Sequence, residues 1–183
     1  MNLYLRVLYV LICSFFKPRI DNVLDPAIVN LRVWLNDLDT NLHMNNGRYL
    51  SMMDLGRLDL ILRSGLLGLV LKHKYQPVLA AVQMRFRIEL KPFRRFHLQT
   101  RVVCWDDKWI YMEQRFLFAS GQKKGAVAAI GIVKGGFYDP HTKTTVPTTD
   151  LLRSLNLPDQ SPDFPAHIKE WIEAEEALRL VTA

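Results

Sequence analysis

Cysteine is scarce in this 183-residue chain: only Cys13 and Cys104 are present, far apart in the sequence. They form neither a disulfide framework nor a CxxC pair, which favours a reducing compartment such as the cytoplasm. The five histidines are scattered, and no pair has the spacing of zinc ligands. A chain of this length buries a sizeable core in one domain. The sequence therefore predicts a fold that needs neither disulfides nor a metal ion.

A long apolar run is missing too. Residues 7–16 are apolar apart from Ser14, whereas a spanning helix needs about 20 such residues. Lys17-Pro18-Arg19 follows the run without a small-x-small cleavage site, so a signal peptide is not indicated. Two interpretations stay open. The segment is either a helix packed on its own domain or on a partner subunit, or a membrane-surface anchor that inserts Phe15 and Phe16.

The net charge of +6 is concentrated in one place. Residues 85–101 contain six Lys and Arg against the single acid Glu89, a net of +5, which leaves +1 for the rest of the chain. One local basic patch favours a phosphate-bearing ligand over nucleic acid. Nucleic-acid binding would also require aromatic residues on the solvent-exposed basic face, and the phenylalanines there are expected to point inward or to lie at strand ends. Lys123 and Lys124, at a predicted hairpin tip, are expected to be solvated.

The apolar pattern predicts a strand, a buried helix and then an antiparallel sheet. The helix over 47–63 is apolar on most sides, which is typical of a buried helix. In it Gly56 would allow a close backbone approach, and Gly65 is a candidate C-terminal cap. Short turns between the later strands exclude helical crossovers. The other expected elements are strands over 31–35, 84–91, 95–105, 109–119 and 125–138, and helices over 66–73, 151–155 and 165–180.

The loop 37–46 is the most informative stretch, with two Asp, three Asn and one His before the buried helix. Free N–H groups at a helix start stabilise a developing oxyanion. An upstream Asp can act as general base or nucleophile, and a His can orient water. The alternative is that the same residues have purely structural roles. The acids would form Asx turns, Asn45 or Asn46 would cap the helix, and His43 would be a hydrogen-bonded structural residue.

Asp37-Leu-Asp-Thr-Asn-Leu-His-Met-Asn-Asn-Gly-Arg-Tyr49 resembles the motif DLDxNxHVNNxxY of plant acyl-ACP thioesterases, with Met44 in place of Val. Its spacing is also similar to that of the 4-hydroxybenzoyl-CoA thioesterase type. The resemblance implies an α+β hotdog fold over 28–140, in which a curved antiparallel sheet wraps a central helix. It leaves an apolar helical extension over 1–27 and a helical tail over 141–183, packed on the same domain. Residues 37–69 and 103–113 look like small eukaryotic thioesterase-superfamily proteins with a hydrophobic N-terminal segment.

The resemblance also implies residue roles. Asp39 matches the carboxylate that attacks the thioester or activates water, and Asn41 and His43 match the positioning residues of the plant enzymes. Asn46 sits where a backbone N–H binds the thioester oxygen. Glu89 is the nearest counterpart of a Glu that the plant enzymes carry on the strand after the helix.

Two other catalytic arrangements of hotdog proteins are alternatives to this assignment. A second hotdog branch uses an acid from the central helix, for which Asp54 is the candidate here. Hotdog hydratases read DxNPxH, with His five residues after Asp. In this chain His43 follows Asp39 by four, without the Pro. The spacing therefore argues against hydration of an enoyl thioester.

The expected substrate is an acyl-CoA or acyl-ACP, with no cofactor and no metal. The resemblance implies a homodimer or a dimer of dimers. The alternative function is a non-catalytic acyl-CoA or lipid-binding module at a membrane surface. The acyl chain is expected along the central helix, near Tyr49, Met52 and Met53. The CoA phosphates are expected at the basic patch, whose alternative is a solvated sheet face, through Arg85, Arg87, Arg94 and Arg95.

Overall fold

The structure is a computed structural model that describes residues 3–154 and 160–181. No helix in these two ranges is long and apolar enough to span a bilayer. In chain order the elements are α1 (Leu3–Phe16), β1 (Ala27–Arg32), a 3-10 turn (Leu35–Asp37), α2 (Asn46–Ser64), α3 (Leu66–His73), β2 (Gln76–Phe86), β3 (Arg95–Trp105), β4 (Ile110–Phe118), β5 (Val127–Asp139), β6 (Thr144–Thr145), α4 (Thr148–Ser154) and α5 (Ala166–Val181).

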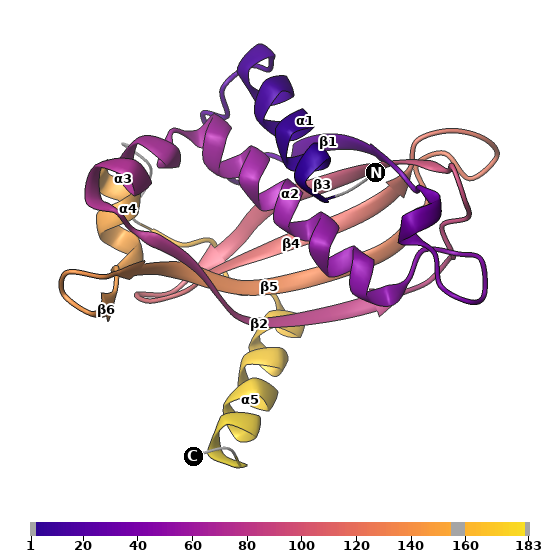
Figure 1. Ribbon diagram of the computed structural model, residues 1–183. Helices are drawn as coiled ribbons and strands as arrows, with labels where there is room; N and C mark the ends of the chain where they lie inside the picture. Colours follow the sequence, from indigo (N-terminus) through magenta and orange to yellow (C-terminus); the bar gives the residue numbers. More distant parts are fainter. Residues whose placement is uncertain (1–2, 155–159, 182–183) are drawn as a thin grey trace.

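A single antiparallel sheet curves around α2 (Figure 1). Its strand order is β1-β3-β4-β5-β2, and β6 pairs with Tyr138 and Asp139 at the end of β5. Register shifts in the pairs β2–β5, β3–β4 and β4–β5 add the local bends that let a sheet curl. The predicted hotdog architecture, with a central helix and a wrapping antiparallel sheet, is confirmed.

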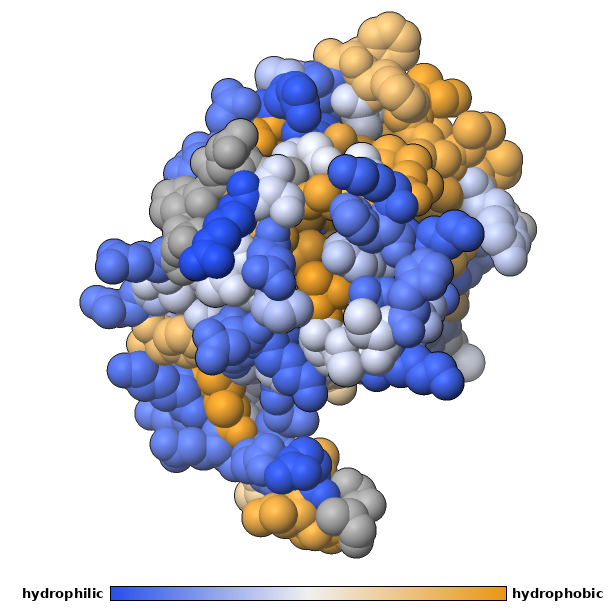
Figure 2. Space-filling view, turned by 90° about the vertical axis from the view of Figure 1, so that its left-hand side faces the viewer, coloured by the Kyte–Doolittle hydropathy of each residue, from blue (hydrophilic) through white to orange (hydrophobic). Residues whose placement is uncertain are grey.

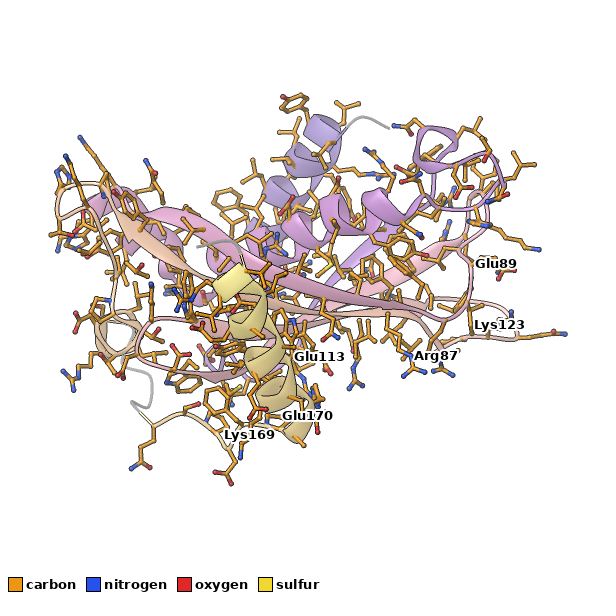
Figure 3. All side chains as sticks on the ribbon, turned by 90° about the horizontal axis from the view of Figure 1, so that it is seen from below. Arg87, Glu89, Glu113, Lys123, Lys169 and Glu170 are labelled. Atoms are coloured by element: carbon orange, nitrogen blue, oxygen red, sulfur yellow. The ribbon has the colours of Figure 1, made fainter. Side chains whose placement is uncertain are left out.

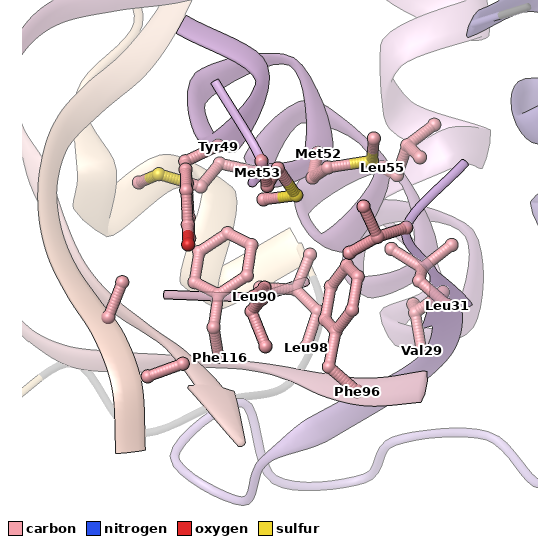
Figure 4. Packing of buried hydrophobic residues seen from close by; sticks show 14 of the residues in the cluster. Val29, Leu31, Tyr49, Met52, Met53, Leu55, Leu90, Phe96, Leu98 and Phe116 are labelled. Atoms are coloured by element: carbon pink, nitrogen blue, oxygen red, sulfur yellow. The ribbon is translucent and has the colours of Figure 1, made fainter. Parts of the chain in front are cut away.

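The main core lies between α2 and the concave face of the sheet (Figure 4). Met52 and Met53 of α2 pack there against Phe96 and Phe116 of the sheet. The predicted close approach at Gly56 is confirmed, because a Cβ there would lie 2.8 Å from Gln114 Nε2 and closer still to Thr100 Oγ1. Since neither of these side chains has room to retreat inside the core, Gly56 is what allows α2 to rest on the sheet.

Helix α1 packs on α2 beside the sheet, with Arg6, Val10 and Ser14 buried. The sequence left this segment open between a packed helix and a membrane anchor, and the helix is packed on its own domain. Its other face stays exposed (Figure 2). The large exposed side chains of this outer face are Tyr4, Leu5, Leu8, Tyr9, Ile12, Phe15 and Phe16.

Two strand predictions need correction. The strand expected over 31–35 ends at Arg32, because the Asp37 carboxylate accepts the Trp34 N–H and starts the 3-10 turn. The strand expected over 84–91 begins at Gln76 and ends at Phe86. Beyond it, the N–H groups of Arg87 and Ile88 both donate to the Ala128 carbonyl, which breaks the regular ladder. Glu89 therefore lies after the strand, not on it.

The C-terminal residues add two helices outside the wrapped core. Helix α4 begins at Thr148, three residues before the predicted start, and the predicted end at Leu155 lies outside the described residues. Helix α5 extends from the convex face of the sheet (Figure 1). It contacts the sheet through Ile168, which is buried in a cluster with Cys104 and Tyr111.

Candidate active site

The loop between β1 and α2 folds back on itself. Leu38 pairs with Met44 in an isolated β-bridge, and the Asp39 N–H donates to the His43 carbonyl at 3.0 Å. At the tip Leu42 has φ of 59°, a left-handed conformation that is uncommon for a residue other than glycine. Such a backbone persists only where its surroundings fix it. The loop is therefore a defined scaffold that presents the short segment 39–43.

Asp37 begins this loop and is fully buried. Its two oxygens accept hydrogen bonds from Arg6 at 3.0 and 2.5 Å. Arg48 of α2 donates to Oδ1 at 3.0 and 3.1 Å, and the Trp34 N–H donates to Oδ2 at 2.8 Å. A carboxylate held by five donors has no lone pair directed at a substrate. Asp37 is thus a structural anchor.

Asp39, two residues on, is about one-fifth exposed. Its Oδ1 accepts the Asn41 N–H at 2.8 Å, while Oδ2 lies 3.5 Å from His43 Nδ1. His43 is about one-third exposed, so the pair is open to solvent and to a ligand. Asn41 is exposed, and it contacts Asp39 through its backbone N–H. The geometry brings Asp39, Asn41 and His43 together, as the motif predicts.

The start of α2 supplies a free backbone donor. Asn45 is the N-cap: its side chain accepts the Gly47 N–H at 2.8 Å, and its own N–H donates to the Asp37 carbonyl at 2.8 Å. Within the described part of the chain, the Asn46 N–H makes no hydrogen bond. An unpaired N–H at a helix N-terminus attracts negative charge. It lies on the same loop as Asp39.

Glu89 joins this end of the molecule from the turn after β2. Its side chain is about half exposed. The pKa of Glu89 is lowered, chiefly because its own backbone N–H donates to it, and Lys91 and Lys123 add positive charge nearby. The Met44 N–H donates to the Leu90 carbonyl at 2.9 Å, which places the turn that carries Glu89 beside the loop. Glu89 is therefore an ionised carboxylate at the same end of the molecule as the Asp39–His43 pair.

A groove with basic walls adjoins Glu89, with Lys91, Arg94 and Lys123 along it. Lys123 is exposed at its hairpin tip, as expected, and the curl of the sheet brings that tip to this groove. Figure 3 shows Lys123, Glu89 and Arg87 at one end of the molecule. Both Lys123 Nζ and the Arg94 guanidinium lie 5.9 Å from the Phe118 ring centroid. Nothing in the sequence indicated that Lys123 and Glu89 line the same groove.

The four arginines of the basic patch do not converge. Arg94 faces the groove beside Glu89, whereas Arg95 lines a different groove along β1, with Arg32 and Trp34. Arg85 is exposed on β2, the edge strand, and Arg87 follows it. A single phosphate cluster that uses all four is therefore not formed within one subunit.

The residues expected to contact the acyl chain are packed core. Tyr49, Met52 and Met53 are at most 3% exposed. Burial raises the pKa of Tyr49 to about 12, although a backbone hydrogen bond from Leu90 opposes the shift. All three side chains belong to the main core cluster shown in Figure 4.

The apolar cavity lies further along α2. It measures about 180 Å³ and is lined in part by residues 77–79 at the start of β2. Arg57 lies at its wall, oriented by a 2.9 Å hydrogen bond to the buried Gln114 and by an ion pair with Asp54. Burial lowers the pKa of Arg57. The remaining lining is mostly aliphatic and aromatic and includes Leu60, Ile61, Val78, Leu79, Val102 and Trp105.

Comparisons with known proteins agree with one another. Residues 33–172 match the model of the thioesterase-like superfamily. Protein THEM6 of Danio rerio is 32% identical over 176 residues, which cover 96% of this chain and 85% of that protein. Among solved structures, the probable thioesterase YbaW from Escherichia coli has a TM-score of 0.64 at 19% identity, with 70% of this chain and 95% of YbaW covered. Slr0204, a 1,4-dihydroxy-2-naphthoyl-CoA thioesterase from Synechocystis, has a TM-score of 0.60 at 10% identity, with coverage of 72% and 95%. At these identities the two structures show a shared fold.

Proposed function

Because the chain belongs to the thioesterase-like superfamily, we propose that it hydrolyses the thioester bond of an acyl-CoA, with Asp39 as the catalytic carboxylate. The observation that carries this proposal is that one short loop holds both an accessible carboxylate and a backbone donor. Asp39 keeps an oxygen directed toward His43 and solvent, and the same loop ends at the unpaired Asn46 N–H. A carboxylate and an oxyanion donor are what acyl transfer to water requires.

The proposed reaction proceeds through a tetrahedral intermediate. Asp39 takes a proton from water as that water attacks the thioester carbon, or attacks the carbon itself and forms an anhydride that water then cleaves. The carbonyl oxygen gains negative charge, and the Asn46 N–H stabilises it at the positive end of the α2 dipole. The C–S bond breaks and the thiolate leaves as the free thiol after protonation. His43, Asn41 and Glu89 orient the water and the carbonyl.

We place the acyl group in the apolar cavity, and this placement involves a second copy of the chain. The outer edge of β2 has no strand partner in the described residues, whereas Arg6 and Lys17 of α1 donate to β1 carbonyls at the other edge. Exposed edges invite pairing. Tyr49, near the start of α2, contacts Phe86 at the end of β2, and the cavity lies at the start of β2. Antiparallel pairing of two β2 strands would bring the Asp39 loop of one copy beside the cavity of the other.

The basic groove beside Glu89 suits the phosphates of coenzyme A. Lys91, Arg94 and Lys123 supply positive charge there, next to the proposed catalytic loop. Charge-assisted hydrogen bonds to phosphate are the stronger class. We therefore propose CoA as the carrier. An acyl-ACP, whose phosphopantetheine carries only one phosphate, would engage this groove less fully.

Release of free thiol from a panel of acyl-CoAs, short to long and aromatic, tests the proposal. Asp39→Asn is expected to lower kcat/KM by at least ~100-fold, the scale of a removed general base. Asp54→Asn is the matched comparison, because it makes the same change to the helix carboxylate at the cavity. Loss with Asp54→Asn but not with Asp39→Asn would move the chemistry to α2. A chain that binds acyl-CoA without turnover would be a binding module.

A second proposal concerns where the enzyme works, in the cytoplasm at a membrane surface. It rests on the outer face of α1, where Phe15 is 81% and Phe16 is 87% exposed and Lys17 and Arg19 follow. An apolar helix face flanked by cations is typical of an interfacial helix. Co-sedimentation with anionic and neutral vesicles tests this. Phe15→Ser/Phe16→Ser should weaken binding, and equal sedimentation of variant and wild type would refute the proposal.

A further inference from the structure

Helix α1 is attached to the domain by two separate polar anchors. Near its start, Arg6 pairs with Asp37 of the catalytic loop. Near its end, the Ser14 hydroxyl and Lys17 both bind the buried Asp59 of α2, at 2.8 and 2.9 Å. Both anchors hold the same helix, but only the first touches the loop that carries the proposed chemistry.

The Arg6 anchor makes more contacts than simple helix docking requires, although its Nε has no hydrogen-bond partner among the described residues. Arg6 is 0% exposed and donates to both oxygens of Asp37. It also donates to the Arg32 carbonyl at 3.1 Å, at the end of β1, and contacts Met52 Sδ at 3.0 Å. Burying an arginine this fully is costly unless its charge is paired and hydrogen-bonded. The ion pair and the hydrogen bonds that offset this cost lie where β1 ends and the loop begins.

Asp37 is hydrogen-bonded to both ends of the loop, so its position restricts both ends. Its carboxylate accepts the Trp34 N–H before the loop, and its carbonyl accepts the Asn45 N–H at the helix cap. The two groups proposed to act on the thioester, the Asp39 carboxylate and the Asn46 N–H, lie immediately beyond these two bonds. If Asp37 moves, the separation of base and oxyanion donor changes.

We propose that Arg6 is a positioning residue for catalysis, and that α1 is in this sense a structural part of the active site. The proposal rests on the proposed function. Arg6 does not touch substrate; it acts through Asp37, whose position fixes the Asp39 loop against the start of α2. A misplacement of about 1 Å in a catalytic group can cost roughly 100-fold in rate. The effect should therefore appear in kcat more than in KM.

The test compares the two anchors of one helix. Arg6→Met removes the charge pair with Asp37, and Lys17→Met removes the charge pair with Asp59 by the same kind of change. Each variant is assayed at least 10 °C below its own Tm. We expect Arg6→Met to lower kcat by roughly tenfold or more with KM within about threefold, and Lys17→Met to leave kcat within about twofold of wild type. Arg6→Lys, which keeps the charge but not the fork geometry, should fall between wild type and Arg6→Met.

Hydrogen exchange of the backbone amides gives a second readout that needs no turnover. Arg6→Met should speed exchange over residues 38–46 while Lys17→Met does not. This readout decides the proposal even if no acyl-CoA is hydrolysed, so its failure is distinct from failure of the proposed function. Equal changes in the two variants, in kcat or in loop exchange, would reduce Arg6 to a docking contact and overturn the proposal. If Arg6→Met does not fold, Arg6→Lys is compared with Lys17→Met in its place. We then expect Arg6→Lys to lower kcat by about fivefold.

Discussion

Asp37 and Asp39 lie two residues apart on one loop, yet they face opposite environments. Asp37 is buried, with donors from two arginines and one backbone amide. Asp39 is partly exposed, with one backbone donor and His43 at 3.5 Å. A buried carboxylate is tolerated when every lone pair is occupied, whereas a reactive one needs an oxygen left unoccupied. The buried half of the loop provides rigidity, and the open half carries the carboxylate that we propose to be catalytic.

The largest effect is expected from neutralising the buried half. Asp37→Asn leaves Arg6 charged and unpaired inside the protein. Removing one partner of a buried ion pair typically costs about 3–5 kcal/mol, a large share of the stability of a domain. Urea unfolding should show this loss. Asp39→Asn should change the free energy of unfolding by less than about 1 kcal/mol, as expected at a partly exposed position. A stability loss of similar size in both variants would remove the distinction between the two halves.

Alkaline pH is expected to act on the buried start of α2, which follows the loop, through Tyr49. Its pKa is about 12 in the folded protein, against 10.0 unperturbed. Below pH 10 the phenol is neutral in both states, so its contribution to stability is fully present. Between pH 10 and 12 only the unfolded state ionises, and stability falls by about 1.4 kcal/mol per pH unit. Tyr49→Phe should therefore show a shallower fall than wild type in urea unfolding at pH 8, 10 and 11. Parallel curves would contradict the assignment.

Arg48 tests how much of the buried half depends on its second arginine. The side chain is 26% exposed and donates twice to Asp37 Oδ1. Arg48→Met leaves the Arg6 pair in place, so the expected cost is about 1.5–3 kcal/mol, the scale of hydrogen bonds to a charged group. Differential scanning calorimetry would measure it. A loss as large as that of Asp37→Asn would show that Arg48, not Arg6, holds the carboxylate.

The smallest effect on activity is expected in the basic groove beside Glu89, next to the open half of the loop. Lys123 lines the groove beside Glu89, and the adjacent Lys124 does not. Lys123→Gln should raise KM for an acyl-CoA by about three- to fivefold, since an exposed charge contact is worth roughly 0.2–1 kcal/mol. Lys124→Gln should leave KM unchanged, and salt should weaken the difference. The same KM shift in both variants would indicate a general charge effect and no phosphate site.

Most of the fold could be predicted because its pattern is local. The strand over 95–105 and the helix 66–73 have the predicted bounds, and α2 differs by one residue at each end. The errors lie where hydrogen bonds outside the regular ladder decide the boundary. Ala128, distant in the sequence, ends β2 by accepting two amides, and the nearby Asp37 carboxylate ends β1 by accepting the Trp34 N–H. The alternation of apolar residues reveals neither of these bonds.

The candidate site was predictable only in part. Asp39, Asn41, His43 and Asn46 follow from the resemblance of one contiguous segment to a thioesterase motif. Arg6 carried a usable signal as the one charged residue within an apolar helix, since such a residue is seldom buried without a partner. Its partner, thirty-one positions away, was not visible. The acyl-contact prediction failed to locate the enclosed space, because both a cavity and a packed core are lined by apolar side chains.

The sequence by itself determined the order of elements, the buried central helix, the Gly56 contact and the residue types of the loop 37–46. These depend on periodicity, backbone freedom and short spacing, which act between neighbours along the chain. Only the tertiary structure decided which Asp is anchored and which is open, that α1 joins the loop through Arg6, and that Lys123 and Glu89 line one groove. Each of these depends on burial and charge pairing between distant residues, and these are set when the sheet curls around α2.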